Sequence, residues 1–204
     1  MSAFPPGFFD RLDPTPDAAF YLPERLVHHI DDEAVRAVGD LYEELGVDRG
    51  TVLDLMSSWV SHFHVPPEEL VVLGMNEAEL RANGAASRCV VHDLNAVPDL
   101  PFDADSFDHA VCCLSVDYLT SPLEVFAEVA QVLRPGGLFV CTFSNRCFPT
   151  KAIRGWLAAR ESERVAIVRR YFELTDGFGP PSADLRTPPH GDGDPLWAVW
   201  AAAR

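Results

Sequence analysis

This chain contains few cysteines, and their spacing does not suit a disulfide framework or a metal site. The 204 residues include five cysteines, an odd number, and no two of them form a CxxC pair. Disulfide frameworks and cysteine zinc sites both depend on such pairs. We therefore expect reduced thiols and no metal site, with the adjacent Cys112 and Cys113 on opposite faces of one strand.

Long apolar runs and basic residues are also in short supply. No run approaches the ~20 apolar residues of a membrane helix, and the opening stretch MSAFPPGFFDRLDP lacks the basic start and apolar core of a signal peptide. The 16 basic residues stand against 31 acidic ones, and the net charge of −15 repels a phosphate backbone. The local basic cluster Arg160–Arg170 is typical of a solvated helix face. We expect a cytoplasmic protein that binds neither nucleic acid nor a membrane.

Short apolar segments alternate with amphipathic ones along most of the chain. The periodicity predicts helices from Asp31 to Gly46 and over Asn76–Asn83, Pro122–Arg134 and Pro149–Arg160. Apolar segments predict strands at Thr51–Leu55, Leu70–Met75, Cys89–Val91, Phe107–Leu114, Leu138–Phe143 and, after the loop TPPHGDGDP, Leu196–Ala201. Apolar strands separated by helices form parallel sheets that are covered on both faces. We predict a doubly wound, mostly parallel α/β sheet.

In such sheets the ligand binds beyond the carboxyl ends of the strands. The first predicted strand, TVLDL, delivers an acidic residue to that edge, as a strand that serves a nucleotide-type ligand would. The turn after it, MSSWVSH, contains none of the glycines that such turns usually carry. The turn is therefore either a cofactor loop built by other means or a loop that has lost its ligand.

Five segments, taken in order, resemble the class I S-adenosylmethionine-dependent methyltransferases that have a type 11 methyltransferase domain. They are VLDL, LGMN, HDLN, LPFDADSFDHAVCCLSVDYL and VLRPGGLFVCTF, and together they extend over about residues 50–145. The resemblance implies a Rossmann-like fold, a domain over residues 51–204 that binds S-adenosyl-L-methionine, and a lid or cap segment over residues 1–50. It implies these cofactor-binding residues: Asp54, Met56, Ser57, Ser58, Asn76, Asp93, Leu94 and Ser115.

The sequence departs from the family pattern in two places. The family's glycines would fall at Met56, Ser58 and Val60, where glycine permits a positive φ and a close approach to the ligand. Asn76 stands where the family usually has an acidic residue that binds both ribose hydroxyls, so a charge-assisted contact is lost. Serine hydroxyls and backbone N–H groups can replace the glycine turn. The alternative is that Met56 and Trp59 fill the pocket.

Candidate residues for chemistry stand around the same predicted edge. Asp117 and Tyr118 follow the fourth predicted strand, where the family meets its acceptor, and either could orient the acceptor or accept a proton. Capping and packing are the structural alternatives for this pair. The segment YLPERLVHHIDD gives His29 as a further catalytic candidate. Substrate-binding candidates are Tyr21, Arg25, His28 and Arg146, and Lys151 is a second possible partner for an anion.

Methyl transfer is an in-line displacement that depends mainly on alignment in a dry pocket. A thiolate acceptor needs no base, so the sequence does not identify the acceptor. Because 204 residues leave no room for a separate substrate domain, we expect a small-molecule acceptor and a monomer or homodimer. Two alternatives stay open: a catalytically inactive binding protein of the same fold, and a non-methylating enzyme that uses the same cofactor.

Overall fold

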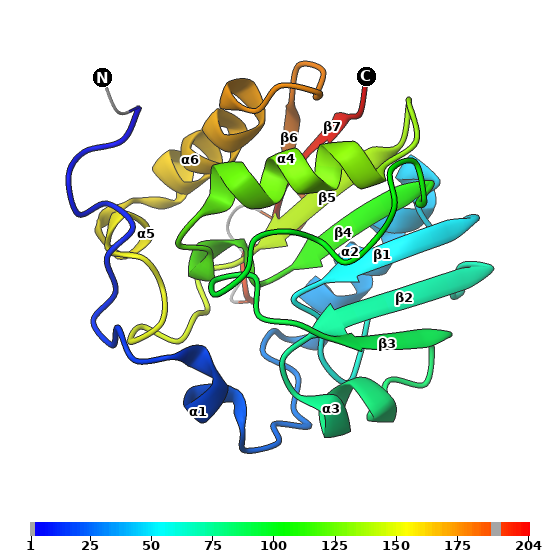
Figure 1. Ribbon diagram of the computed structural model, residues 1–204, viewed down its shortest axis with the longest axis horizontal. Coiled ribbons are helices and arrows are strands. Elements are labelled where there is room, and N and C mark those ends of the chain that lie inside the picture. Colours follow the sequence, from blue (N-terminus) through cyan, green and yellow to red (C-terminus); the bar gives the residue numbers. More distant parts are fainter. Residues whose placement is uncertain (1–2, 189–192) are drawn as a thin grey trace.

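Seven strands form one sheet in the computed structural model, which describes residues 3–188 and 193–204. Residues 189–192 of the loop TPPHGDGDP therefore lie outside the described residues. The strands follow the order β3-β2-β1-β4-β5-β7-β6 (Figure 1). Their bounds are β1 Thr51–Leu55, β2 Glu69–Gly74, β3 Arg88–Val91, β4 His109–Cys113, β5 Leu138–Phe143, β6 Ser182–Leu185 and β7 Trp197–Ala202. β1 to β5 run parallel, and β7 pairs antiparallel with both β5 and β6. The predicted doubly wound, mostly parallel sheet is confirmed.

Runs of apolar residues in the sequence predicted six of these strands, and the seventh, β6, was not predicted. The bounds of β1 and β5 agree with the prediction to the residue, and β2, β3, β4 and β7 differ from it by one or two residues at an end. β6 was not predicted because its sequence, SADL, has no apolar run and its residues alternate between exposed and half-buried. A short strand at the edge of a sheet buries too little surface to leave an apolar signature.

Side chains alternate between two cores, one on each face of the sheet. Val52, Val72 and Val111 point to the face covered by α2 (Asp32–Leu45). Leu53 and Leu73 point to the other face, which is covered by α4 (Pro122–Val132) and α6 (Glu161–Leu174). Figure 1 shows α4 and α2 on opposite sides of the strands. Cys112 and Cys113 divide between the two cores as predicted, and all five cysteines are free.

Helix α2 illustrates how local sequence sets its own limits. Asp31 caps its start by accepting a hydrogen bond from the N–H of Ala34 at 2.9 Å. Gly46 ends it in the left-handed conformation with φ 68°, and its N–H reaches the last carbonyls. Although α2 falls within the predicted lid segment, six of its residues are buried against the sheet.

Residues before α2 form the segment that approaches the ligand edge. This N-terminal segment runs past α5 (Arg154–Ala158) and through α1 (Asp17–Tyr21), on the side where the parallel strands end (Figure 1). α1 was not predicted from the sequence, and it spans only five residues. The predicted helix over 149–160 is wrong in its first half, because residues 149–152 form turns before α5 begins. Within the described ranges, no helix has the length and apolarity to cross a membrane.

Candidate functional site

A cavity of about 330 Å³ lies at the carboxyl ends of the parallel strands, beneath the N-terminal segment. The loops after β1, β2, β3, β4 and β5 all contribute to its lining. The structure brings nearly all the predicted site residues together there: Tyr21, Arg25, His28, His29, Asp54, Met56, Ser57, Ser58, Asn76, Asp93, Leu94, Ser115, Tyr118 and Arg146. Asp117 and Lys151 are the candidates from the sequence that do not line it.

Asp54, the next-to-last residue of β1, carries a buried carboxylate that is held by hydroxyl groups. Its side chain is 3% exposed, and Oδ2 accepts hydrogen bonds from Ser57 Oγ at 2.7 Å and Ser61 Oγ at 2.6 Å. Asn83 Nδ2 in turn donates to Ser61 Oγ at 2.7 Å. Burial raises the pKa of Asp54 to about 6, and the two hydroxyls only partly offset that rise. The site therefore holds a carboxylate that gains from a cationic partner.

The turn after β1 keeps the backbone path of a glycine turn without containing glycine. Met56, at the first glycine position of the family pattern, has a left-handed backbone with φ 54°. The N–H of Ser57 donates to the carbonyl of Leu73 at 2.8 Å. A Cβ placed on Gly74 would overlap the Ser57 carbonyl oxygen. The small residue that permits close approach is thus supplied by the neighbouring strand.

Trp59 does not close the cavity. Its Nε1 donates to the carbonyl of Val27 at 3.2 Å, and its ring stacks on His28 with centroids 5.1 Å apart. Met56 and Trp59 both line the cavity, and about 330 Å³ stays open beside them. Trp59 therefore joins the β1 turn to the N-terminal segment.

Asn76 and Glu79 attach the N-terminal segment to the end of β2. Asn76 Oδ1 accepts from two N–H groups at the start of α3 (Glu77–Ala82), and Nδ2 donates to the carbonyls of Tyr21 and Leu22 at 3.0 and 3.1 Å. These contacts use the whole amide, so its predicted ribose contact would have to replace some of them. Glu79 Oε1 accepts from the N–H of Arg25 at 2.7 Å, and Oε2 accepts from Ser58 Oγ at 2.5 Å.

Glu79 is a cavity residue that sequence reasoning placed in a helix without giving it a role. It is 8% exposed, and it connects the β1 turn to the N-terminal segment. His62 was missed as well. Its backbone is left-handed with φ 38°, and its Nδ1 is buried with no hydrogen-bond partner among the described residues. Burial, with smaller contributions from His28 and His29, lowers the pKa of His62 to about 4. Neither residue falls in a recognisable motif.

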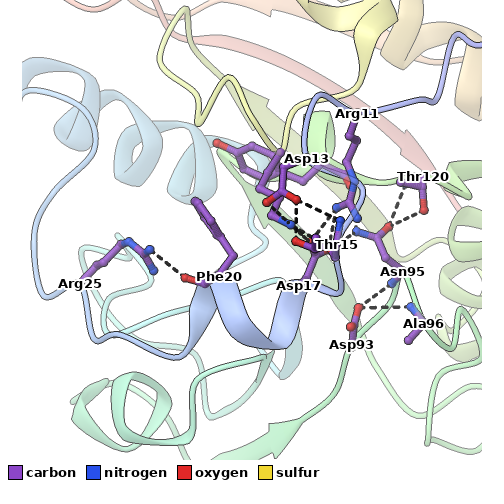
Figure 2. A network of polar contacts seen from close by, with 12 residues as sticks. Arg11, Asp13, Thr15, Asp17, Phe20, Arg25, Asp93, Asn95, Ala96 and Thr120 are labelled. Atoms are coloured by element: carbon purple, nitrogen blue, oxygen red, sulfur yellow. Dashed lines mark hydrogen bonds and ion pairs between the residues drawn. The ribbon is translucent and has the colours of Figure 1, made fainter.

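The loop after β3 is anchored by Asn95, another residue without a predicted role. Asp93 Oδ1 accepts from the N–H groups of Asn95 and Ala96, and the adjacent Leu94 is buried. Asn95 Nδ2 donates to Asp17 Oδ2 at 2.9 Å and to the Tyr118 carbonyl at 3.0 Å. Figure 2 shows how Asn95 joins this loop to α1.

A buried ion network fixes α1 beside the cavity. Lys151 is 0% exposed, and its Nζ lies 2.9 Å from Asp13 Oδ2, 3.1 Å from Asp17 Oδ1 and 2.9 Å from the Thr15 carbonyl. Arg11 Nη1 donates to both oxygens of Asp17 at 2.8 and 2.7 Å (Figure 2). The expectation that Lys151 could bind an anionic substrate is therefore wrong, because its ammonium group is enclosed by the protein's own carboxylates.

The three candidate residues that follow β4 are Ser115, Asp117 and Tyr118, and they lie in different environments. Ser115 Oγ donates to the Cys113 carbonyl at 3.0 Å, which holds the backbone at the cavity edge. The Tyr118 hydroxyl accepts from the N–H of Phe148 at 2.9 Å, and burial raises the pKa of this phenol. Asp117 is buried away from the lining, with its Oδ2 unpartnered among the described residues, and burial raises its pKa to about 8. It is therefore a neutral acid at pH 7.

His29, the remaining catalytic candidate, lies at the mouth of the cavity. Its ring centroid is 5.3 Å from that of Phe148 in an edge-on arrangement. Partial burial lowers the pKa of His29, so its imidazole is neutral at physiological pH.

The motif resemblance is confirmed by a family comparison. Residues 47–141 match the family model described as a methyltransferase domain. S-adenosyl-L-methionine is therefore the expected cofactor. The residues that line the cavity suit the charge of this cofactor. S-adenosyl-L-methionine carries an ammonium and a sulfonium group, and the buried carboxylates of Asp54 and Glu79 line the cavity.

A curated relative matches half of the chain. This chain is 29% identical over 110 residues to the biotin biosynthesis bifunctional protein BioHC of Teredinibacter turnerae. The matched region covers 50% of this chain and 19% of that protein. The matched half of the chain thus spans about one fifth of its relative.

Solved structures share the fold at low sequence identity. A SAM-dependent methyltransferase from Aquifex aeolicus is 14% identical with a TM-score of 0.59, over 85% of this chain and 94% of that one. The cyclase SpnF is also 14% identical with a TM-score of 0.58, over 92% of this chain and 90% of that one. At such identity these likenesses show the fold alone.

Proposed function

We propose that this protein transfers a methyl group from S-adenosyl-L-methionine to a small-molecule acceptor. The observation that supports this proposal is the cavity at the strand ends, which is lined by Asp54 and by residues of the N-terminal segment. Its volume of about 330 Å³ falls within the range of ~300–1,000 Å³ that is usual for small-ligand sites. A macromolecular acceptor would need a more open surface.

In this proposal, three sets of residues have different roles. Asp54 receives the amino group of the cofactor, because its carboxylate is desolvated and already oriented by Ser57 and Ser61. Asp93 and Leu94 contact the adenine, with Asp93 Oδ2 available while Oδ1 holds the loop. The N-terminal segment keeps water out of the reaction.

The remaining requirement of the proposed reaction is a group that can take a proton from the acceptor. When bound, the cofactor supplies an electrophilic methyl group: a bond forms from the acceptor atom to the methyl carbon, the carbon–sulfur bond breaks, and S-adenosylhomocysteine leaves. A hydroxyl acceptor must also lose its proton. His29 is placed for that task as a neutral imidazole at the cavity mouth. Tyr118 serves as a positioning residue, since its hydroxyl holds the backbone of Phe148.

A second candidate function is ligand binding without catalysis. It is favoured by the glycine-free turn and by Asn76, whose amide is fully used in holding the N-terminal segment. In this case the fold would keep its cavity and lose tight cofactor binding.

Calorimetric titration with S-adenosylhomocysteine separates the two candidates. The methyltransferase proposal expects a dissociation constant in the micromolar range or below, and an Asp54→Ala variant that folds and binds far more weakly. Transfer of labelled methyl groups to a panel of metabolites then tests the reaction. Absence of binding by a folded protein would refute the proposal, and turnover to a product that gains no methyl group would indicate non-methylating chemistry.

A further inference from the structure

Aromatic rings gather around Phe148 in the part of the cavity formed by the N-terminal segment and the loop after β5. The ring centroids of Phe20 and His29 each lie 5.3 Å from that of Phe148, and the ring of Tyr118 is stacked on it at 6.0 Å. Phe148, His29 and Tyr118 all line the cavity. Such a surface favours a flat ring, because offset and edge-on aromatic contacts add to the burial of apolar area.

Arg25 places an uncompensated positive charge in the same cluster. Its guanidinium carbon lies 4.7 Å from the ring centroid of Phe20 and 5.5 Å from that of Phe148. Nη1 donates to the Pro23 carbonyl at 3.1 Å and Nη2 to the Phe20 carbonyl at 2.8 Å. A guanidinium has five N–H donors, so these two bonds leave donors for a ligand.

No carboxylate of the described chain forms an ion pair with Arg25. Glu79 approaches it but bonds to its backbone N–H. The other arginine that lines the cavity, Arg146, is already paired through Nε with Asp194 Oδ1 at 2.6 Å. In a chain with 31 acidic residues and a net charge of −15, an arginine that lines a cavity without a carboxylate partner suits an anionic ligand.

We propose that the acceptor is a planar aromatic compound that bears a carboxylate, with its ring on the Phe148 cluster and its carboxylate on Arg25. This inference rests on the proposed function for the reaction, but the binding preference can be measured without turnover. The competing possibility is that Arg25 pairs with the carboxylate of the cofactor, and the experiment distinguishes the two.

Three phenols that share one ring and differ in charge provide the test. The protein saturated with S-adenosylhomocysteine is titrated with 4-hydroxybenzoate, phenol and tyramine, which carry a negative, no and a positive charge on the same ring. We expect 4-hydroxybenzoate to bind at least about tenfold more tightly than phenol, with tyramine weakest. Arg25→Gln should reduce the preference for the anion to about twofold or less, while the affinity for S-adenosylhomocysteine stays within about twofold.

Two further variants control this measurement. Arg81→Gln removes an equal charge from the exposed face of α3, where Arg81 pairs with Glu77, and should leave the preference unchanged. Phe148→Leu keeps apolar volume but removes the ring, and should weaken the binding of all three phenols by a similar factor. Melting curves establish that each variant is folded, and a lack of anion preference in the unmodified protein overturns the inference even if Arg25→Gln fails to fold.

Each outcome of these titrations either supports or overturns the inference. Equal binding of the three phenols, a preference for tyramine, or no binding of any of them overturns the inference and leaves the proposed function standing. A loss of S-adenosylhomocysteine affinity in Arg25→Gln, with the anion preference intact, assigns Arg25 to the cofactor and overturns it too. If S-adenosylhomocysteine does not bind the unmodified protein, the proposed function falls, and titration of the free protein still decides the preference.

Discussion

At the scale of single residues, neighbouring residues supply what the missing glycines of the turn after β1 would provide. Met56 adopts the left-handed conformation that glycine would otherwise supply, with φ 54°. For a side chain other than glycine this conformation is strained by about 1–2 kcal/mol. Ser57 and Ser61 hold Asp54 by hydroxyl groups, and Gly74 on β2 leaves room for the Ser57 carbonyl. The site therefore depends on four particular side chains and on the absence of one at Gly74.

Replacing Asp54 by asparagine should weaken cofactor binding and remove its pH dependence. The carboxyl group has a pKa of about 6, so it is charged above that pH and neutral below it. A bound ammonium group favours the charged form, so the affinity of the unmodified protein for S-adenosylhomocysteine should fall as pH drops through 6. At pH 7.5 we expect Asp54→Asn to bind about tenfold or more weakly, roughly 1.4 kcal/mol.

Calorimetric titrations between pH 5 and 8 check this prediction. The Asp54→Asn variant should show no step in affinity near pH 6. If both proteins lose affinity in parallel over that range, another group controls binding and the role of Asp54 is wrong.

Gly74→Ala should damage the site, because the new methyl group would overlap the carbonyl oxygen of Ser57. Overpacking of this kind costs about 1–3 kcal/mol, and the displaced turn should also weaken S-adenosylhomocysteine binding. Gly84→Ala is the matched control, since a Cβ there has nothing within 4 Å. Urea unfolding and titration of both variants give the comparison. Equal behaviour of the two alanine variants would show that the turn tolerates the extra atom.

At the scale of elements, the N-terminal segment is held by two separate sets of polar contacts. Asn76 and Glu79 bind its residues 21–25 from the end of β2 and the start of α3. Lys151 and Asn95 bind α1 from the loops after β5 and β3. Figure 2 shows Asn95, a member of the second set, beside Asp17 of α1. Because these partners lie in the loops, or in the short helix α3, that directly follow strand ends, the cover over the cavity is continuous with the cavity wall.

Lys151→Met should loosen α1. The substitution leaves Asp17 buried with Arg11 as its remaining cationic partner, and removing one member of a buried ion network costs about 3–5 kcal/mol. We expect unfolding at lower urea concentration and faster proteolysis within residues 3–31. Arg170→Met breaks an exposed pair with Glu173, and it should change stability by less than about 1 kcal/mol. Equal stability of the two variants would contradict the structural role of Lys151.

At the scale of the whole molecule, both cores border buried polar groups that have no hydrogen-bond partner among the described residues. The Tyr42 hydroxyl is such a group in the core under α2, and the core under α4 and α6 borders several more. Asp117 Oδ2, the Tyr171 hydroxyl and Trp156 Nε1 have no hydrogen bond within the described residues. Buried acids of this kind make stability depend on pH.

Asp117→Asn should flatten the pH dependence of stability. The pKa of Asp117 is about 8 in the folded protein and near 3.8 when exposed, so the folded state keeps a proton that the unfolded state releases. Stability therefore falls as pH rises from about 4 to 8, and is constant above the folded pKa. Near pH 4 the variant should match the unmodified protein, and at pH 8 it should be the more stable. Melting temperatures across this range test the prediction, and a constant difference at all pH values would contradict it.

The sequence alone determined the architecture and the edge where the site lies. Apolar runs such as Leu138–Phe143 and the cap and stop of α2 are local signals, because a residue's neighbours in the chain set the strand and helix periods. The rule that ligands bind at strand ends then gathered Asp54, Asp93 and Ser115 correctly at one cavity.

Only the tertiary structure decided which partner each of those side chains has. Gly74 makes room for a turn nearly twenty residues earlier, Glu79 bonds to the backbone of Arg25, and Lys151 is enclosed by carboxylates from the N-terminal segment. Asp117 is turned away from the cavity, although it stands next to Tyr118, which lines it. Such contacts join residues far apart in sequence and depend on how loops pack, so no local periodicity records them.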